Sequence, residues 1–581
     1  MNHLAGLSVL VLGLGDSGLA MAAWALRYGA TATVWDSRAE PPQLATLREQ
    51  LPAVEFFHGE LPESALTGVQ LVLKSPGLSP LDARLQPLLS LARASGIPVQ
   101  GELDLFARAL ADLKAERGYA PAVLAITGTN GKTTTTCMTA LLVERAGKRV
   151  AVAGNIGPSM LSTLAAALDL EPAKVSTEAP AEASVEESGE EGASVPAEQD
   201  PTPVDVPAEP EPEMSTLDEL DALLDEQPLP IKPPPPKGPV FEHLPEVWVL
   251  ELSSFQLDTV HGFEPTAAAV LNITQDHLDW HGDMAAYVRA KARVFAGEHT
   301  LMVINRDDAL VEAMVPAPVL VKQGRGRAAK LASRAVVRFG LNAPDHPGDY
   351  GLVSEGGMAW LVRAREVDET LKRRKDEDEE EIILQRLMPA DALRVRGRHN
   401  AANALAALAL ASAAGCELAP MLHGLRDYRG EPHRVEYVAS IRGVDFYDDS
   451  KGTNVGATVA AINGLGADRA PAKLVLILGG DGKGQDFAPL REGVARHARA
   501  LALIGRDALQ IEAALQGCEL PMQRHDTLEA ATSWCLQQAH SGDSVLLSPA
   551  CASLDMFRNY GHRAEVFVAQ VHELANDGGL S

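Results

Sequence analysis

Residues 123–134 read VLAITGTNGKTT and join an apolar run to a glycine-containing turn. We predict a buried strand over 123–126 and a helix over 135–145 on either side of that turn. This order is typical of a phosphate-binding loop, whose backbone N–H groups surround phosphate oxygens. Ile126 stands where the full motif has its first glycine. The sequence still predicts an ATP site, made by Gly128, Thr129, Asn130, Gly131, Lys132, Thr133 and Thr134.

Charged groups at strand ends extend this site. Lys132 would contact the β- and γ-phosphates, and the Thr133 hydroxyl would ligate Mg²⁺. Glu251 follows the apolar run 247–250, which favours a second Mg²⁺ ligand over the more common surface role. The predicted strand 267–273 is followed by TQDHLDWH, residues 274–281, whose acids and histidines suit cations and phosphates. Asp276 or Asp279 has the alternative role of capping a helix.

A second glycine turn lies near the N-terminus, in residues 8–18, SVLVLGLGDSG. We predict a strand over 8–12, a helix through Ala25 and a second strand over 32–35 that ends at Asp36. This pattern indicates a Rossmann-like domain, in which the later acid reaches a ribose hydroxyl. The pattern does not identify the ligand, because such turns also hold nucleotides other than dinucleotides.

Length and charge limit the class of protein. A chain of 581 residues is too long for one core, so three domains are expected. A net charge of −27 argues against nucleic-acid binding. No apolar run is long enough to insert into a membrane, and five widely spaced cysteines suggest a reducing, cytoplasmic location.

Much of the negative charge lies in one segment, the proline-rich residues 169–239. Between Asp169 and Gly238 there are 19 acidic residues and three lysines, a net −16. This composition predicts a disordered insert, which is a candidate contact for an unknown protein. The charged run 363–383 is predicted to be a solvated loop, with an exposed helix as the alternative.

The motifs together resemble the Mur ligase family, which adds amino acids to bacterial cell-wall precursors. The shared features are GTNGKT (128–133), ELSSFQL (251–257) and DHLD (276–279). The stretches YDDSKGTN (447–454), GGDGK (479–483) and SPACASLD (548–555) are similar to the D-glutamate-adding members. The resemblance implies an α/β fold with a Rossmann-like N-terminal domain (1–115), a central P-loop ATPase-type parallel sheet (116–426) and a Rossmann-like C-terminal domain (427–581).

The resemblance also implies residue roles. It implies that the N-terminal turn holds UDP rather than a dinucleotide, and that the UDP substrate contacts Asp16, Ser17, Asp36, Ser37, Arg38, Gly77 and Asn155. The nucleotide base and ribose would contact His399, Asn400, Asn403, His433, Arg434 and Asp449. D-Glutamate would contact Lys451, Thr453, Lys483, Ser553, Leu554 and Tyr560. Two Mg²⁺ ions would be held by Thr133, Glu251, His277 and Lys291.

Lys291 has no distinguishing pattern of its own in the helical run 287–295. The resemblance implies that its amine is carbamylated, which would convert an ammonium into an oxygen ligand.

The implied substrates are UDP-N-acetylmuramoyl-L-alanine and D-glutamate. ATP would phosphorylate the substrate carboxylate, and the amine would then attack the acyl phosphate. His277 or a neighbouring acid is the candidate acceptor for the amine proton. We expect a monomer.

Three alternatives remain at this stage. A related ligase would add another amino acid, although the C-terminal stretches speak against it. A nicotinamide-dependent oxidoreductase built on the first domain leaves the phosphate-binding loop unexplained. A non-catalytic nucleotide-binding scaffold would use the acidic insert to recruit partners.

Overall fold

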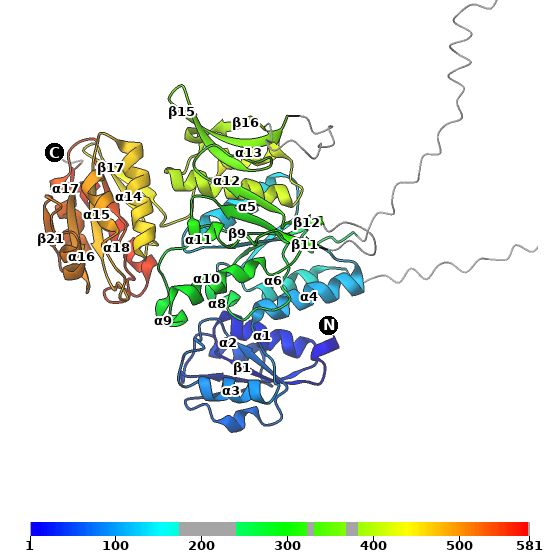
Figure 1. Cartoon of the computed structure of the whole chain (residues 1–581). Coiled ribbons are helices and arrows are strands. Elements are labelled where there is room, and N and C mark those ends of the chain that lie inside the picture. Colours follow the sequence, from blue (N-terminus) through cyan, green and yellow to red (C-terminus); the bar gives the residue numbers. More distant parts are fainter. Residues whose placement is uncertain (1, 173–239, 322–329, 368–381, 579–581) are drawn as a thin grey trace, which may run out of the picture. The chain divides into compact units, whose positions relative to one another are not determined.

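A computed structural model of the chain describes residues 2–172, 240–321, 330–367 and 382–578 (Figure 1). Almost all of these residues fall within one compact unit, Met1–Leu170 and His243–Ser581. The fold is α/β, with three main sheets that follow one another along the chain.

The N-terminal sheet has five parallel strands in the order β3-β2-β1-β4-β5, which is the order of a Rossmann-like half. The strands are β1 (Ser8–Leu12), β2 (Thr31–Asp36), β3 (Glu55–His58), β4 (Leu71–Lys74) and β5 (Val99–Gln100). The helices are α1 (Asp16–Arg27), α2 (Leu44–Gln50), α3 (Gln86–Ala94) and α4 (Glu102–Arg117). The predicted boundary at residues 115/116 thus falls within the last turn of α4.

The central sheet has nine strands in the order β16-β15-β14-β13-β10-β9-β6-β8-β7. Its parallel part comprises β6 (Ala122–Thr127), β7 (Val150–Gly154), β8 (Val247–Glu251), β9 (Ala267–Val270), β10 (Leu301–Asn305), β13 (Val336–Phe339) and β14 (Tyr350–Glu355). Apolar residues of β6 and β9 pack against α5 (Lys132–Arg145) and the alanine-rich α12 (Arg398–Ala413). This packing fixes the start of α5, and with it the phosphate-binding loop, at the carboxyl ends of the parallel strands.

The sheet is only partly parallel, whereas the sequence predicted a parallel sheet. Strands β15 (Met358–Glu366) and β16 (Ile382–Pro389) extend it in antiparallel fashion from β14. The prediction of a charged loop over 363–383 is therefore wrong at both ends, because residues 363–366 belong to β15 and residues 382–383 belong to β16. Charged side chains are tolerated there because antiparallel strands can expose one face of a sheet to water.

The acidic segment also begins later than predicted. Asp169 belongs to α6 (Met160–Leu170), and its carboxylate pairs with Arg27 Nη2 at 2.6 Å. Residues 173–239 lie outside the described part of the chain.

Further elements of this region are short or lie on the sheet faces. They are α8 (Ser254–Leu257), α9 (Leu278–His281), α10 (Met284–Ala292), α11 (Ala309–Glu312), α13 (Leu418–Asp427) and the hairpin β11 (Val319–Val321) and β12 (Lys330–Ala332).

The C-terminal sheet has six strands in the order β17-β18-β22-β19-β20-β21, of which only the edge strand β17 is antiparallel. Alternate residues of β19 point to opposite faces, so that Leu476 packs in one hydrophobic cluster and Val475 in another. Helices α14 and α15 contribute to the first cluster, and α17 and α18 to the second. The sheet is thus covered on both faces, as in a Rossmann-like fold.

The strands of this sheet are β17 (Glu436–Ile441), β18 (Val444–Asp448), β19 (Leu474–Gly479), β20 (Ala498–Ile504), β21 (Met522–Arg524) and β22 (Ser544–Leu547). Its helices are α14 (Val455–Arg469), α15 (Leu490–His497), α16 (Ala508–Ala514), α17 (Leu528–Gln538) and α18 (Tyr560–Gly578).

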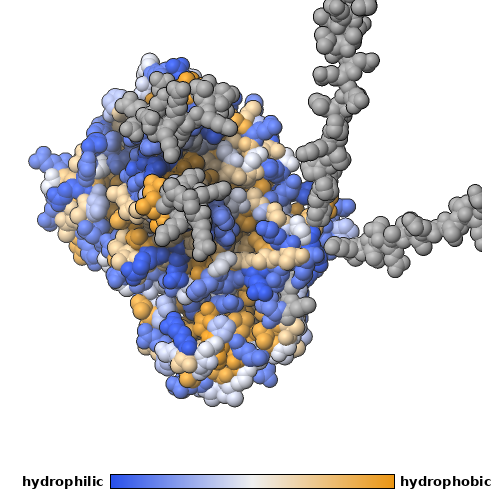
Figure 2. Space-filling view, turned by 45° about the vertical axis from the view of Figure 1, so that its right-hand side comes forward, coloured by the Kyte–Doolittle hydropathy of each residue, from blue (hydrophilic) through white to orange (hydrophobic). Residues whose placement is uncertain are grey.

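No helix among the described residues has both the length and the apolar character needed to cross a membrane. Figure 2 shows hydrophilic and hydrophobic residues interspersed over the face that it presents.

Candidate active site

The phosphate-binding loop joins β6 to α5 as the sequence predicts, but the helix begins at Lys132 rather than at residue 135. Gly131 precedes it with φ +81°, a conformation that favours glycine. Lys132 Nζ donates to the carbonyl oxygens of Gly128 (3.0 Å) and Thr129 (2.8 Å). Burial lowers the pKa of Lys132, although Glu251 and Asp276 act in the opposite direction. The ammonium group therefore already lies at the turn where phosphates would bind.

The segment after β9 packs along this loop. The predicted strand 267–273 ends at Val270, and the backbone then hydrogen-bonds with the loop instead of continuing the sheet. Thr129 N donates to Asn272 O (2.9 Å), and Asn130 N donates to Asn272 Oδ1 (2.8 Å). Thr129 Oγ1 also accepts from Thr274 N at 2.9 Å. These contacts satisfy groups that a glycine turn would otherwise leave unpaired.

Glu251 ends β8 between the phosphate-binding loop and residue 154. Its register partners are Ile126 in β6 and Gly154 in β7, and its side chain is buried. Asn155 Nδ2 donates to Glu251 Oε1 (2.8 Å), and Asn155 N donates to Glu251 O (2.7 Å). Gly154 permits this approach, because a Cβ there would lie 2.3 Å from Glu251 O.

The other carboxylate oxygen, Glu251 Oε2, is buried and has no hydrogen-bond partner among the described residues. A buried anionic oxygen without a donor is costly, and a divalent cation would satisfy it. The Thr133 hydroxyl, the other predicted ligand, accepts a hydrogen bond from Arg434 Nη2 at 2.5 Å. A cation at Thr133 would use the same oxygen lone pairs.

Lys291 lies in α10 and is almost fully buried, with 1% of its surface exposed. Its Nζ donates to Gly128 O (2.8 Å) and lies 4.7 Å from the ring centre of Tyr287. Burial and the nearby Lys132 ammonium lower the pKa of Lys291 well below its ordinary value. Tyr287 also contacts the loop, with its hydroxyl 3.0 Å from Thr129 Oγ1.

The acid and histidine cluster lies beside Phe255. The His277 ring contacts the Phe255 ring at 4.7 Å between centres, and its Nε2 is 3.5 Å from Asp276 Oδ2. Desolvation lowers the pKa of His277, although Asp276 acts in the opposite direction. Asp276 does not cap α9, because the residue at the N-cap position is His277. The Asp276 Oδ1 instead accepts a hydrogen bond from the backbone N–H of His277 (3.0 Å). Nor does Asp279 cap it, because it lies inside the first turn.

His281 is the second histidine of the predicted cluster, and the sequence assigned it no separate role. It is buried, its Nε2 lies 2.9 Å from Ser254 Oγ, and its ring stacks on Phe255 at 5.8 Å. Burial lowers its pKa to about 4, so the ring is neutral near pH 7. This residue fixes the position of Phe255.

A cavity of about 330 Å³ lies against the phosphate-binding loop. Its lining includes Lys451 and eight of the predicted ATP residues, namely Asn130, Gly131, Thr134, His399, Asn400, Asn403, Arg434 and Asp449. Gly128, Thr129, Lys132 and Thr133 belong to the loop but not to this lining. Asn305 and Phe339, at the ends of β10 and β13, also line it. They were missed, although strand ends at this edge are where ligands collect.

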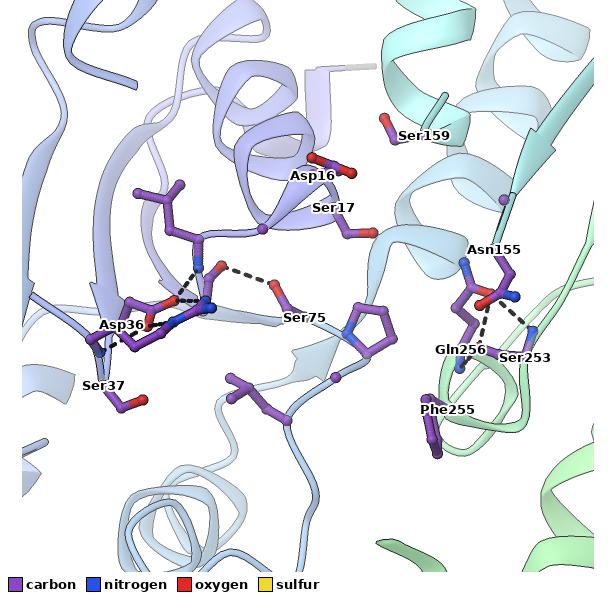
Figure 3. Close-up of a pocket in the computed structure, with 18 of the residues that line it drawn as sticks. Asp16, Ser17, Asp36, Ser37, Ser75, Asn155, Ser159, Ser253, Phe255 and Gln256 are labelled. Carbon is purple, nitrogen blue, oxygen red and sulfur yellow. Dashed lines mark hydrogen bonds and ion pairs between the residues drawn. The ribbon is translucent and has the colours of Figure 1, made fainter. Parts of the chain in front are cut away.

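A second cavity, of about 540 Å³, is lined by all seven predicted UDP-substrate residues (Figure 3). Asp16, Ser17, Asp36 and Ser37 lie on one side, and Asn155, Ser253, Phe255 and Gln256 lie on the other. Gly77 and Arg38 complete the predicted set.

Asp36 does not have a free oxygen for a ribose. Its Oδ2 accepts from Leu14 N (2.8 Å) and Arg38 Nη2 (2.9 Å), and its Oδ1 accepts from Arg38 N and Nε (both 2.9 Å). Burial would raise the pKa of Asp36, but these hydrogen bonds outweigh it and the net effect lowers the pKa. Asp36 therefore holds the glycine turn and Arg38, which is unlike the role of the acid in a dinucleotide site.

The predicted D-glutamate residues lie in loops that follow three neighbouring strands, β18, β22 and β19, except for Tyr560, which begins α18. Lys451 Nζ lies 3.8 Å from the ring centre of Tyr560. The loop with Lys483 pairs with that of Ser553 through Asp481 and Ala552, whose backbones exchange hydrogen bonds of 3.0 and 2.8 Å. Ser553 is buried, whereas Lys483 and Leu554 are exposed. Thr453 N donates to Lys451 O at 2.8 Å.

Comparison with known proteins identifies the family. The Mur ligase middle domain matches residues 126–194 and 241–411, the MurD-like N-terminal domain matches 7–101, and the Mur ligase glutamate ligase domain matches 433–551. The UDP-N-acetylmuramoylalanine–D-glutamate ligase of Albidiferax ferrireducens is 53% identical, covering 100% of this chain and 99% of that protein. The chain belongs to the Mur ligase family.

Other relatives carry the same name. Those of a Polaromonas species and Burkholderia pseudomallei are 46% and 51% identical, covering 100% and 99% of this Mur ligase and 100% and 98% of those proteins. The crystal structure of UDP-N-acetylmuramate-alanine ligase MurC from Thermotoga maritima has a TM-score of 0.49 and 18% identity, covering 97% of this chain and 99% of that one.

Two buried charges of this Mur ligase had no sequence signal. Glu102 begins α4 and accepts from Ser17 Oγ (2.7 Å) and Leu161 N (3.1 Å), and burial raises its pKa. It thereby links a UDP-cavity residue to the first turn of α6. Arg563, in the first turn of α18, is fully buried and donates to two backbone carbonyls.

Proposed function

We propose that this Mur ligase joins D-glutamate to UDP-N-acetylmuramoyl-L-alanine at the expense of ATP, as a step of peptidoglycan precursor synthesis. The observation that carries the proposal is the 53% identity over the whole chain to a UDP-N-acetylmuramoylalanine–D-glutamate ligase. The phosphate-binding loop, the cavity beside it and the cavity lined by the predicted UDP-substrate residues support the same reaction.

ATP would bind with its phosphates on the loop 128–134 and its nucleoside in the 330 Å³ cavity. Lys132 lies at the carbonyls of Gly128 and Thr129, so a small movement would bring its ammonium to the phosphate oxygens. Asn400, Asn403, Arg434 and Asp449 line the cavity and offer polar contacts to the ribose and base. Phosphoryl transfer relies mainly on such positioning and charge neutralisation.

The residues at Glu251 fit a divalent cation, because the carboxylate presents a buried, unpartnered oxygen next to the loop. We propose that Thr133 and Glu251 hold one Mg²⁺ and that His277 and Lys291 hold a second. Bound Mg²⁺ would neutralise phosphate charge during transfer.

We propose further that Lys291 is carbamylated, so that it offers an oxygen rather than an ammonium to the second Mg²⁺. Its amine is buried, and its pKa is lowered by desolvation and Lys132. The neutral amine is the form that adds carbon dioxide, forming an N–C bond and releasing one proton. The product is an anion, which suits the neighbouring Lys132.

The UDP portion would occupy the 540 Å³ cavity. Arg38, held by Asp36, offers a guanidinium to the diphosphate, while Ser37 and Asp16 offer polar contacts. Asn155 would serve two purposes, since it lines this cavity and also positions Glu251.

D-Glutamate carries two carboxylates, and the C-terminal loops offer cations and hydroxyls to bind them. Lys451 and Lys483 are the cations, and Thr453 and Ser553 are the hydroxyl donors. Leu554 and Tyr560 would flank the amino acid.

The chemistry proposed is acyl transfer through an acyl phosphate. The substrate carboxylate oxygen forms a bond to the γ-phosphorus while the bond to ADP breaks. The neutral amine of D-glutamate then attacks the acyl carbon, and phosphate leaves with the electron pair of the C–O bond. His277, or Asp276 beside it, would accept the proton that the amine loses.

Phosphate release tests this function. The reaction would be run with UDP-N-acetylmuramoyl-L-alanine, ATP, Mg²⁺ and either enantiomer of glutamate, and we expect release with the D form only. Equal release with L-glutamate, or release with another amino acid alone, would overturn the substrate assignment.

We also propose that the enzyme acts as a monomer in the cytoplasm. Sedimentation equilibrium at micromolar concentration would give the mass of one chain, 61.6 kDa. A mass of two or more chains would contradict the proposal.

A further inference from the structure

The first turn of α18 presents two side chains to the loops of the predicted D-glutamate site. Tyr560 and Arg563 are three residues apart and so lie on the same face of the helix. Lys451 Nζ lies 3.8 Å from the centre of the Tyr560 ring. Arg563 is 0% exposed and is among the largest fully buried side chains of the described residues.

The Arg563 guanidinium joins two loops. Its Nη2 donates to Ser450 O (2.7 Å) and its Nη1 donates to Cys551 O (3.2 Å). Ser450 directly precedes Lys451, and Cys551 lies two residues before Ser553. One rigid, planar group thus holds the backbone beside two residues proposed to bind D-glutamate.

The other contacts of these loops do not replace this link. The Ser450 hydroxyl and backbone N–H bond to Asp448 Oδ1 (2.6 and 2.9 Å), within the same loop. Ser548 Oγ donates to Asp449 Oδ2 (2.6 Å), which joins the loops at their beginnings. Arg563 joins them further along, at the Lys451 and Ser553 side.

Arg563 also carries a buried positive charge. No carboxylate oxygen of the described residues lies within 4.0 Å of its nitrogens, and its Nε has no hydrogen-bond partner among those residues. Burial lowers its pKa to about 10, with Cys551, Asp448, Asp555 and Asp449 acting in the opposite direction, so it is cationic at neutral pH. A buried charge with only neutral acceptors costs stability, whereas beside a dianionic amino acid it lowers the free energy of binding.

We propose that Arg563 is a positioning residue for D-glutamate. It fixes the separation of the Lys451 and Ser553 loops and adds a buried positive charge beside them. This inference rests on the proposed assignment of these loops to the amino acid substrate.

The test measures the KM of each substrate and kcat for Arg563→Met and Arg563→Lys. In Arg563→Met we expect the KM for D-glutamate to rise about tenfold or more, because both charged hydrogen bonds are lost. In Arg563→Lys the charge remains but the two-carbonyl contact does not, so we expect a smaller rise. The KM for ATP and for the UDP substrate should stay within about twofold in both.

Arg558→Met is the matched control. Arg558 is 77% exposed and lies 3.9 Å from Glu565, so its loss should leave all three KM values unchanged. An unchanged KM for D-glutamate in Arg563→Met, or an equal rise in all three KM values, would overturn the inference. If Arg563→Met does not fold, as judged by its thermal melting curve, Arg563→Lys carries the same test.

The wild-type enzyme separates this inference from the function on which it rests. D-Glutamate-dependent ADP release by the wild type establishes the function before any variant is measured. If the wild type uses another amino acid instead, the proposed function fails, and the KM for that amino acid then tests Arg563.

Discussion

Lys132 and Lys291 both donate to the carbonyl oxygen of Gly128, at 3.0 and 2.8 Å. Burial lowers the pKa of both side chains, and the charge of Lys132 lowers the pKa of Lys291 further, because two ammonium groups on one acceptor repel each other. A carbamate on Lys291 would replace this repulsion with attraction. This relationship is the physical basis of the carbamate that we propose on Lys291.

Replacement of Lys291 by alanine tests this modification. We expect Lys291→Ala to lose ligase activity by about a hundredfold or more, because one metal ligand is absent. Added acetate should restore part of the activity, since it supplies a carboxylate oxygen in the space that the side chain leaves. Lys114→Ala, at an exposed position, is the control. Full activity of Lys291→Ala without acetate would argue against the carbamate.

Replacement of Glu251 by glutamine tests the metal site. The amide of Glu251→Gln would keep an acceptor for Asn155 but remove the negative charge from the unpartnered oxygen. We expect the Mg²⁺ concentration for half-maximal activity to rise about tenfold. Glu246→Gln, at the exposed start of the same strand region, should behave as wild type. An unchanged Mg²⁺ requirement in Glu251→Gln would exclude this residue as a ligand.

Arg38 and Arg84 offer a closely matched pair for testing the UDP cavity. Each arginine pairs with an aspartate two residues earlier, and their side chains are 55% and 60% exposed. Only Arg38 lines the cavity. We expect Arg38→Ala to raise the KM for the UDP substrate about tenfold and Arg84→Ala to leave it unchanged. Equal effects of the two substitutions would refute a direct contact.

Asp449 predicts a dependence of stability on pH. Burial raises its pKa to about 7 from 3.8, although Ser548 and Arg434 act in the opposite direction. Between these two pH values the folded protein binds more protons than the unfolded chain, so this group makes stability fall as pH rises from about 4 to about 7. Asp449→Asn should remove this pH-dependent loss of folding free energy, which amounts to at most about 4 kcal/mol.

Melting temperatures at pH 5 and pH 8 measure the effect. We expect the melting temperature of Asp449→Asn, relative to that of the wild type, to be higher at pH 8 than at pH 5. A difference between the two proteins that does not vary with pH would show that Asp449 is ionised throughout.

The sequence predicted the loop at Lys132 because glycines and the flanking apolar runs determine backbone conformation locally. The family resemblance grouped Asp16, Arg38 and Asn155 as UDP-substrate residues, and all three line one cavity, although Asn155 follows a strand of a different sheet. Lys291 was assigned only through the family resemblance, because a lysine in a helix has no local signal of burial. Its roles, like those of the other site residues, remain predictions.

Other features depended on contacts between distant segments. Arg563 bonds to the backbone of Ser450 and Glu102 to that of Leu161, which are far away in the chain, and no spacing rule anticipates such contacts. The end of strand β15 and the start of β16 were not predicted, because the charged composition there favoured a loop. The predicted strand 267–273 was too long because Leu271 and Ile273 are apolar, but in the structure the strand ends at Val270 and Ile273 N donates to Asp308 instead.

The most direct test of the proposed chemistry follows oxygen atoms. UDP-N-acetylmuramoyl-L-alanine would be labelled with ¹⁸O in both carboxylate oxygens and converted with ATP and D-glutamate, and the phosphate would be analysed by mass spectrometry. An acyl phosphate requires one ¹⁸O in each phosphate released and the other in the amide. Unlabelled phosphate formed in step with product would contradict the account.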